Sequence, residues 1–260
     1  MNVLAFDIET IPDVAGGRAL HDLSGLSDSE IGEAMFRLRR EKTGNDFLPT
    51  HVQKVVAISA VYRNTSSNTF KVWTLGEESS SEKEIIQRFY DGVERFTPTL
   101  VTWNGSGFDL PVLHHRGLIN GVTAERYWDQ GDDDRDFKWN NYISRFHARH
   151  TDLMDVLAGY QNRAFAPLDE IAVLLGLPGK MGMSGSKVWQ QYQHGEIKAI
   201  RDYCETDALN TYLVYLHWQR MKGLLSAAEF NQETEVVVDA LSGAEPHLQE
   251  FLAVWRSKVD

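Results

Sequence analysis

Four segments rich in β-branched and aromatic residues alternate with polar turns in the first part of the chain, a pattern typical of β-strands. They cover residues 2–10, 54–63, 69–75 and 99–104. The polar stretch NTSSN at 64–68 is short enough to join the second and third strands in a hairpin. Both faces of the first strand begin with apolar residues, which indicates a central strand covered on both sides.

Helical patterns dominate the rest of the chain. Residues 81–96 open with Ser81 and Glu84, the spacing of a capping box, and continue with apolar residues at helical intervals. A second helix is predicted at 110–118. From residue 153 onward the predicted helices are 153–160, 167–175, 186–194, 197–222 and two more that end near Trp255. Strands first and helices later predict an α/β fold, with a mixed sheet flanked by helices and a helical C-terminal part.

No repeat or interdomain linker interrupts this pattern, so we expect one domain over residues 1–260, with a helical C-terminal extension at 224–260. Two regions have the character of insertions. Residues 11–50 contain one predicted helix, which opens near Ser27 and ends near Gly44, and residues 122–145 are polar and aromatic. The acidic run GDDD in the second region lacks the alternating ligand spacing and closing glutamate of a calcium loop, which favours a solvated loop.

The composition is that of an ordinary globular protein with an acidic balance. Hydrophobic residues make up 42% and charged residues 24% of the chain, which excludes disordered and collagen-like classes. We expect a cytoplasmic protein without membrane contact, because the N-terminus lacks the basic region of a signal peptide and no apolar run approaches a span of roughly 18 residues. The single cysteine, Cys204, excludes an internal disulfide and a cysteine-based zinc site. The net charge of −11 argues against binding nucleic acid by counterion release alone, and by itself favours a metabolic enzyme.

The first strand ends with two acids on one face. Side chains alternate along a strand, so Asp7 and Glu9 point to the same side, roughly 7 Å apart along the backbone. Desolvating two carboxylates this close together is costly unless a cation lies between them. The alternative is that the strand end is exposed and both carboxylates are hydrated.

Two further sites place polar groups where a core would be expected. Asp109 follows a glycine-bearing turn at the end of a strand and opens a helix, where it is either a buried acid or an N-cap. Tyr203 and Asp207 are four residues apart in the helix 197–222 and share an inward face with Ile200. They are either part of a site or a satisfied hydrogen-bonded pair.

Taken together, Asp7, Glu9, Asp109 and Asp207 are candidate ligands for hard cations. Oxygen-only ligand sets suit Mg²⁺ or Mn²⁺. Two such ions stabilise the attacking and leaving oxygens of a phosphoryl displacement. The acids therefore predict a site for two divalent ions.

Three short motifs, in this order, resemble the exonuclease motifs of the DEDD superfamily in its tyrosine branch. They are Phe6-Asp7-Ile8-Glu9-Thr10, Asn104-x-x-x-Phe108-Asp109 and Tyr203-x-x-x-Asp207. The chain is more closely similar to bacterial stand-alone exonucleases related to the proofreading domain of family-B DNA polymerases. That similarity extends over nearly the whole chain, through SKVW at 186–189, IRDYCETD at 200–207, NTY at 210–212 and HLQEFL at 247–252.

The resemblance implies a ribonuclease-H-like fold with a mixed sheet of five strands. Because the pattern shows only four, we place the fifth around residues 140–151. The implied activity is 3′→5′ hydrolysis of single-stranded nucleic acid, with DNA favoured, to nucleoside 5′-monophosphates. The 3′ end of single-stranded DNA or RNA is the implied partner, together with an unidentified polymerase or repair protein, because no polymerase domain follows in this sequence.

The resemblance also implies roles for the site residues. The four acids would hold two ions of Mg²⁺ or Mn²⁺. Tyr203, whose ordinary pKa is near 10, would orient the attacking water by a hydrogen bond rather than act as a strong base. Asn104 and Phe108 are candidates to contact the terminal nucleotide. Lys187, in a glycine-rich stretch, is a weaker candidate for substrate binding, since it is more typical of an ordinary surface cation.

The other branch of the superfamily uses a His-x-x-x-x-Asp motif, which His150 and Asp155 match in spacing. We favour Tyr203, because its surroundings resemble the family more closely and it lies on an apolar-striped helix. Asp152 is retained as an accessory acid, with helix capping as the alternative.

Three other functions remain open at this point. The chain could be a nucleic-acid- or partner-binding module that has lost catalysis, although all four acids and the tyrosine are present. It could be an RNA-trimming exoribonuclease. A small-molecule phosphohydrolase would share the metal chemistry, but the sequence has no phosphate-cradling Gly-Lys motif.

Overall fold

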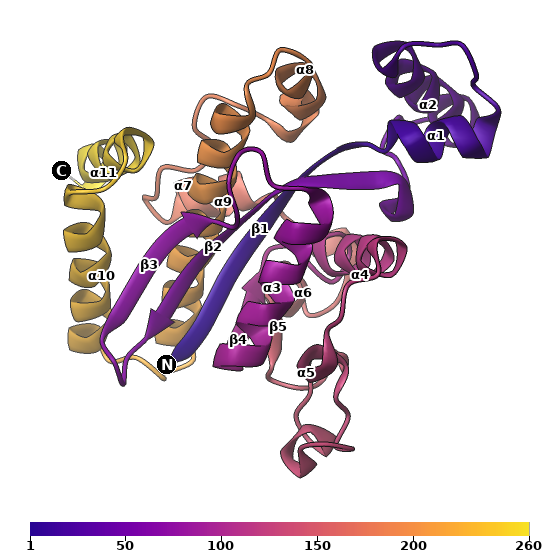
Figure 1. Cartoon of the computed structure of the whole chain (residues 1–260). Helices are drawn as coiled ribbons and strands as arrows, with labels where there is room; N and C mark the ends of the chain where they lie inside the picture. The colour runs from indigo at the N-terminus through magenta and orange to yellow at the C-terminus, as the bar shows by residue number, and fades with distance from the viewer. Residues whose placement is uncertain (260) are drawn as a thin grey trace.

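Five strands form one mixed sheet in the order β3-β2-β1-β4-β5 (Figure 1). The computed structural model describes residues 1–259, so Asp260, the last residue of the expected C-terminal extension, lies outside them. β1 pairs antiparallel with β2, and β2 with β3, whereas β1–β4 and β4–β5 are parallel pairs. The predicted five-stranded mixed sheet flanked by helices is confirmed. The strands are β1 (Asn2–Pro12), β2 (Gln53–Asn64), β3 (Thr69–Thr74), β4 (Thr99–Thr102) and β5 (His150–Asp152).

The fifth strand begins only at the end of the region in which we expected it. Residues 140–149 form turns, and the strand consists of three residues, of which Asp152 pairs with Thr102 of β4. Upstream, residues 122–149 hold only the short helices α5 (Glu125–Trp128) and η2 (Arg135–Lys138). A strand of three residues is too short to show an alternating pattern, so pairing with β4 defines it.

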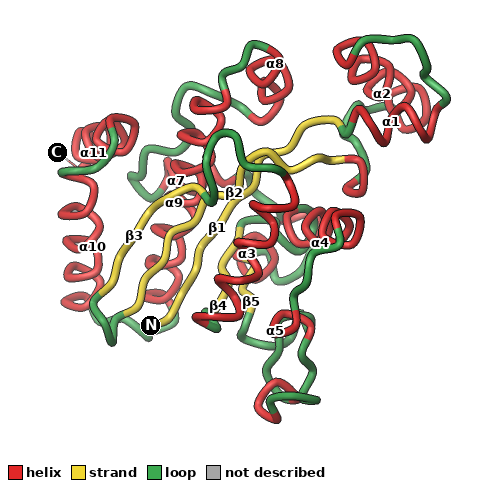
Figure 2. Tube along the Cα trace, viewed as in Figure 1, coloured by secondary structure: helices red, strands yellow, loops and turns green. Residues whose placement is uncertain are grey.

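Helices cover both faces of the sheet and form the C-terminal part of the chain (Figure 2). Within residues 1–259, no helix is both long and apolar enough to cross a membrane. The longer helices are α1 (Val14–His21), α2 (Asp28–Thr43), α3 (Glu82–Phe96), α4 (Asp109–Asn120), α9 (Ile197–Met221), α10 (Ala227–Ser242) and α11 (Pro246–Val259). The shorter ones are η1 (Thr50–Val52), α6 (Leu153–Leu157), η3 (Asn162–Ala164), α7 (Leu168–Leu174), η4 (Gly185–Lys187) and α8 (Val188–Gln193).

The alternation of side chains along β1 divides the core into two layers. Val3 and Ala5 pack in one cluster with residues of α9, α10 and α11. Leu4, Phe6 and Ile8 pack in another cluster with residues of α3 and α4. β1 is therefore buried on both faces, as its apolar pattern predicted, and the face that carries Val3 and Ala5 continues toward Asp7.

The region 11–50 holds two helices where the sequence pattern predicted one. α2 begins after Ser27, which forms a capping box with Glu30. The additional helix α1 is capped by Asp13, whose side chain accepts a hydrogen bond from the backbone of Gly16. Two adjacent glycines lower the helix propensity of this segment, which is why the pattern did not indicate it. Figure 1 shows α1 and α2 at the far end of β1 and β2, away from the rest of the sheet.

A buried ion cluster attaches this region to the main body. The Arg116 guanidinium donates to the Glu82 carboxylate at 2.6 and 2.7 Å and to Asp13 at 2.6 Å. Arg116 belongs to α4, Glu82 opens α3, and Asp13 caps α1. The cluster thus joins three helices with largely buried, charge-assisted hydrogen bonds.

Candidate active site

Two strand residues and one helix residue bring three carboxylates together. Asp7 and Glu9 lie on β1, and Asp207 lies on α9, which crosses the face of β1. Each of the three offers a carboxylate oxygen, and these oxygens all lie within 4.8 Å of one another. The structure therefore places these three predicted ligands in one group, although they are up to two hundred positions apart in the sequence.

Burial and mutual repulsion disturb the ionisation of this group. The pKa values of Asp7 and Glu9 are raised well above their ordinary range, first by burial and then by the neighbouring carboxylates. Burial raises the pKa of Asp207 to about 6. A cluster of acids that resists ionisation in this way is a site for compensating positive charge. The donors are three carboxylates without nitrogen or sulfur, a set that fits Mg²⁺ or Mn²⁺.

Asp109 lies near this group but not in it. It is the first residue of α4 and is 3% exposed. Its charge raises the pKa values of Asp7 and Glu9, and burial raises its own pKa to about 7. Phe108, not Asp109, occupies the N-cap position of α4, so capping does not account for the burial of Asp109. Its predicted role as a fourth ligand remains a prediction.

Tyr203 lies beside the carboxylate group on the same helix as Asp207. It is buried, and burial together with the charges of Asp207 and Glu9 raises its pKa above its ordinary value. The hydroxyl therefore keeps its proton and is available as a hydrogen-bond donor. The next residue, Cys204, directs its thiol at Asp7, with Sγ 3.3 Å from the backbone oxygen and 3.6 Å from Oδ2.

The two residues predicted to contact the terminal nucleotide line different cavities, each of which contains a site acid. Asn104 has φ of 64° and lines a cavity with Tyr203, Asp207 and Trp103. Phe108 lines a second cavity with Glu9. Its ring packs against Phe47 from the inserted region, with 5.4 Å between ring centroids.

Lys180, not Lys187, is the cation beside the acids. Lys180 lines the cavity of Tyr203 and Asp207, and its charge lowers the pKa values of Glu9 and Asp207. Lys187 is exposed at the end of η4 and lines neither cavity that contains a site acid. Sequence reasoning missed Lys180, although it stands in the same glycine-rich stretch, because the pattern of the loop does not show which way it folds.

Asp152 has a different environment from the other acids. Its Oδ1 accepts from the backbone N–H groups of Asn104 at 2.9 Å and Met154 at 3.1 Å, and its Oδ2 accepts from Ser106 at 2.8 Å. The carboxylate caps α6 and fixes the turn between β4 and α4. It is absent from the carboxylate group near α9.

The histidine alternative is also located away from the carboxylate group. His150 lies on β5, where a ring nitrogen is 2.8 Å from Thr102 Oγ1, and burial lowers its pKa to about 4. Asp155 lies in α6. The structure thus places Tyr203, rather than His150, next to Asp7, Glu9 and Asp207.

The acidic run at 131–134 forms a tight loop around a preceding acid. The carboxylate of Asp129 accepts hydrogen bonds from the backbone of Gly131 at 2.8 Å and of Asp134 at 3.0 Å. Among residues 1–259, the only group of three metal-ligating side chains is the one on β1 and α9. The acids of the run therefore do not converge on a calcium site.

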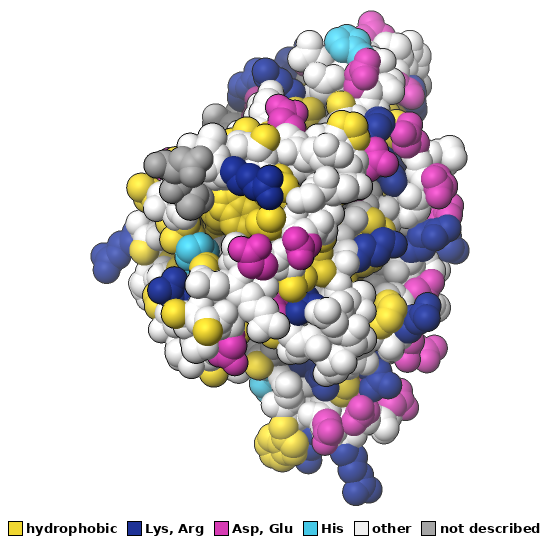
Figure 3. Space-filling model, turned by 90° about the vertical axis from the view of Figure 1, so that its left-hand side faces the viewer, with side chains coloured by type: hydrophobic (Ala, Val, Ile, Leu, Met, Phe, Trp, Pro, Cys, Tyr) yellow, Lys and Arg dark blue, Asp and Glu magenta, His cyan; other side chains and the backbone are white. Residues whose placement is uncertain are grey.

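Charged side chains of both signs are interspersed on the face that carries α10 and α11, which is turned toward the viewer in Figure 3. This face shows no continuous basic patch. On this face, attraction for a polyanion must therefore come from a few local cations.

The sheet order and the covering helices are those of a ribonuclease-H-like fold. Residues 45–255 match the family described as predicted 3′-5′ exonuclease related to the exonuclease domain of PolB, and the chain belongs to this family. The matched range includes Asp109, Tyr203 and Asp207. Asp7 and Glu9 precede it, so the structure supplies their place in the site.

Two curated relatives are DNA polymerases. The chain is 21% identical over 222 residues to the catalytic polypeptide of DNA polymerase epsilon from Saccharomyces cerevisiae, covering 83% of this chain and 9% of that protein. It is 24% identical over 142 residues to a DNA polymerase of Archaeoglobus fulgidus, covering 52% of this chain and 17% of that protein. The chain thus matches only a small part of each polymerase.

Proposed function

We propose that this chain is a metal-dependent 3′→5′ exonuclease that releases nucleoside 5′-monophosphates from single-stranded nucleic acid. The observation that carries the proposal is the convergence of Asp7, Glu9 and Asp207 within 4.8 Å, beside Tyr203. Family membership supports the reaction class. The names of the curated relatives, both DNA polymerases, favour DNA over RNA as substrate. We also propose a polymerase or repair protein as partner, and a cytoplasmic location.

Asp7, Glu9 and Asp207, with Asp109 nearby, would hold two ions of Mg²⁺ or Mn²⁺. When bound, such ions stabilise the attacking and leaving oxygens of the phosphoryl displacement. The protonated hydroxyl of Tyr203 holds and orients the attacking water. Lys180 faces the phosphate, and Asn104 and Phe108 contact the terminal nucleotide from the two cavities that they line.

The test is digestion of end-labelled single-stranded DNA and RNA with and without Mn²⁺. We expect stepwise shortening from the 3′ end, release of 5′-monophosphates and no reaction in EDTA. Matched oligomers that differ only at the 2′-hydroxyl determine whether DNA or RNA is preferred. Binding without cleavage in Mn²⁺ would instead identify a catalytically silent binding module, and cleavage of nucleotides but not oligomers a small-molecule phosphohydrolase.

A further inference from the structure

A groove leads away from the candidate active site along the turn between β4 and α4. The cavity of Tyr203 and Asp207 adjoins a second cavity of about 540 Å³, because Asn104 and Phe165 line both. The second cavity adjoins a third of about 350 Å³, with which it shares Ser106, Arg145 and Tyr160. We call the second and third cavities together the lateral groove.

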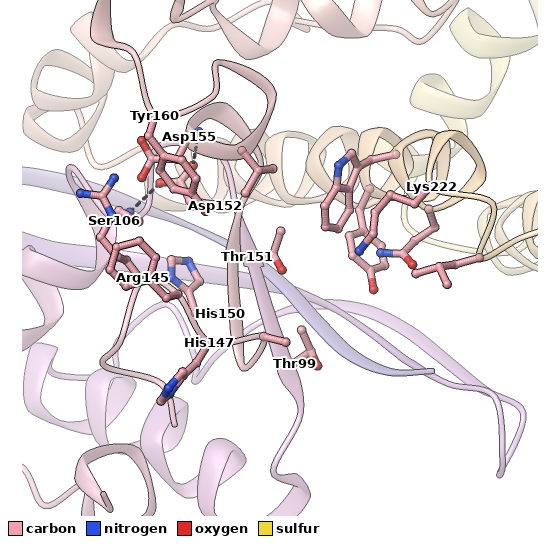
Figure 4. A pocket seen from close by; sticks show the side chains of 17 residues that line it. Thr99, Ser106, Arg145, His147, His150, Thr151, Asp152, Asp155, Tyr160 and Lys222 are labelled. Atoms are coloured by element: carbon pink, nitrogen blue, oxygen red, sulfur yellow. Dashed lines mark hydrogen bonds between the residues drawn. The ribbon is translucent and has the colours of Figure 1, made fainter. Parts of the chain in front are cut away.

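The lateral groove follows the free edge of the sheet. β5 is an edge strand, and its residues His150, Thr151 and Asp152 line the third cavity. Figure 4 shows Thr151 and His150 between Arg145 and Tyr160 on one side and Lys222 on the other. The groove therefore extends from the acids on β1, past the β4–α4 turn, to the C-terminal end of α9.

Its side chains combine cations with exposed aromatic faces. The Arg145 guanidinium lies 4.7 Å from the ring centroid of Tyr160, and Lys222 Nζ lies 3.9 Å from that of Trp218. Tyr160 is 40% and Phe165 37% exposed. Within residues 1–259, neither Arg145 nor Lys222 forms an ion pair with an acid. Free cations at such positions are notable in a protein with a net charge of −11.

The two acids that line the lateral groove, Asp152 and Asp155, do not fully cancel the positive charge of Arg145 and Lys222. Asp152 uses both carboxylate oxygens on backbone N–H groups of the turn and the α6 cap. Asp155 is partly buried and lines both cavities, where the nearby charge of Arg145 lowers its pKa against the raising effect of burial. Arg145 and Lys222 therefore outnumber Asp155, the one acid of the lateral groove whose carboxylate is not held by backbone N–H groups.

We propose that the lateral groove binds the upstream nucleotides of a single-stranded substrate whose 3′ end lies at the carboxylates. Arg145 contacts a backbone phosphate, and unpaired bases stack on Phe165 and Tyr160. Aromatic stacking with electrostatic tracking of the backbone is the usual mode of binding to single strands. A duplex, whose bases are already stacked, lacks the faces that these rings contact. This assignment rests on the proposed function for the position of the 3′ end.

The test compares a short substrate with a long one, to distinguish contacts with the upstream nucleotides from effects on the chemical step. Thymidine 5′-monophosphate p-nitrophenyl ester reaches only the carboxylates, whereas an oligonucleotide of about ten residues also fills the groove. We expect Arg145→Gln to raise the KM for the oligonucleotide about fivefold and Tyr160→Ala about tenfold. Neither change should alter kcat or hydrolysis of the ester by more than about twofold, since the variants leave the carboxylates intact.

Two matched controls lie in the neighbouring loop region but outside the groove. Arg135→Gln removes the same charge, and Trp139→Ala removes an aromatic ring that is 75% exposed. Both should leave the KM for the oligonucleotide unchanged. Arg145→Gln should also lower the slope of log affinity against log salt by roughly 0.7, the contribution of one phosphate contact in a single strand.

Direct binding distinguishes failure of this assignment from failure of the proposed function. In the non-cleaving variant Asp7→Asn, fluorescence anisotropy with a labelled oligonucleotide should show weaker binding when Arg145→Gln is added. If that holds but wild-type protein cleaves nothing, the groove stands and the exonuclease proposal fails. If wild-type protein cleaves but Arg145→Gln and Tyr160→Ala change neither KM nor binding, the groove assignment is wrong. An increase in KM for Phe47→Ala alone would place the strand on the side of Phe108 instead.

Discussion

Replacing Asp207 by asparagine should stabilise the protein in the absence of metal. The pKa of Asp207 is about 6 in the folded chain, against an ordinary value of 3.8. At pH 7 the carboxylate is ionised, so holding it in the folded state costs about 3 kcal/mol, at about 1.4 kcal/mol for each pKa unit. Asparagine is nearly isosteric and neutral, and it keeps an oxygen that can accept from Tyr203.

The expected signature is an inversion between metal-free and metal-loaded protein. In EDTA at pH 7, Asp207→Asn should raise the melting temperature by about 6–12 °C, taking about 2–4 °C per kcal/mol for a chain of this size. Saturating Mn²⁺ at about 100 times its Kd should stabilise the wild type by about 2.7 kcal/mol, and the variant much less. Differential scanning calorimetry in both buffers measures each melting temperature.

The pH dependence of stability tests independently whether the ionised Asp207 carboxylate destabilises the metal-free protein. A carboxyl group with a raised folded pKa retains a proton that the unfolded chain has already released. The stability that Asp207 contributes to the metal-free protein is therefore full below about pH 4 and is lost as the pH rises through about 6. Asp207→Asn should remove this part of the pH dependence. The matched variant Asp202→Asn lies on the same helix, where Asp202 pairs with Lys198 at 2.9 Å, and should cost at most about 1 kcal/mol.

Lower stability of Asp207→Asn in EDTA, together with an unchanged response to Mn²⁺, would refute this reasoning. It would mean that the carboxylate is satisfied by the protein and that the three acids are not a cation site. An equal gain in stability from Asp202→Asn would point instead to the global charge of −11 as the cause.

Three further predictions concern catalysis, folding and proton release. Tyr203→Phe should lower kcat on single-stranded DNA by roughly 10²-fold, through loss of the donor hydroxyl, whereas His150→Ala should leave it nearly unchanged; timed digestion measures both, and the reverse order would favour the histidine branch. Arg116→Met should lower the free energy of unfolding by about 3–5 kcal/mol, because it leaves the Glu82 carboxylate buried without a charged partner; a urea titration that showed no shift would contradict this. Because burial raises the pKa of Asp109 to about 7, Mn²⁺ binding should release protons below about pH 7 and tighten as the pH rises, and calorimetry in buffers of different ionisation enthalpy should detect the release.

The parts of the fold that the sequence predicted are those with a periodic signal. β1 and β2 are long and apolar, α3 has a capping residue and an apolar stripe, and α9 has 25 residues. The missed elements lack such a signal. β5 has three residues and exists because β4 pairs with it, and α1 contains two glycines. Tertiary contacts define these short elements, and those contacts cannot be predicted from the pattern of a single sequence.

The site was predictable to the extent that each acid stood in a conspicuous place. Asp7 and Glu9 interrupt an apolar strand, and Tyr203 and Asp207 share an inward helix face. Lys180 and the thiol of Cys204 had no comparable signal. Their approach to the acids depends on how a glycine-rich loop folds and on how closely α9 packs against β1, which residue spacing alone does not determine.

Asp152 shows why residue type and spacing cannot assign a role to a carboxylate. Like Asp109, it is a buried acid at the end of a strand where a helix begins. Its oxygens accept backbone N–H groups, which stabilise its charge without a cation. Within residues 1–259, no backbone N–H group donates to Asp7, Glu9 or Asp207, and their ionised form is disfavoured. That difference follows from the orientation of peptide groups. Asp152→Asn should therefore loosen the turn at Asn104 and lower the stability of the protein. It should leave the number of bound Mn²⁺ ions unchanged, and equilibrium dialysis measures that number. Loss of one bound ion would instead make Asp152 a ligand.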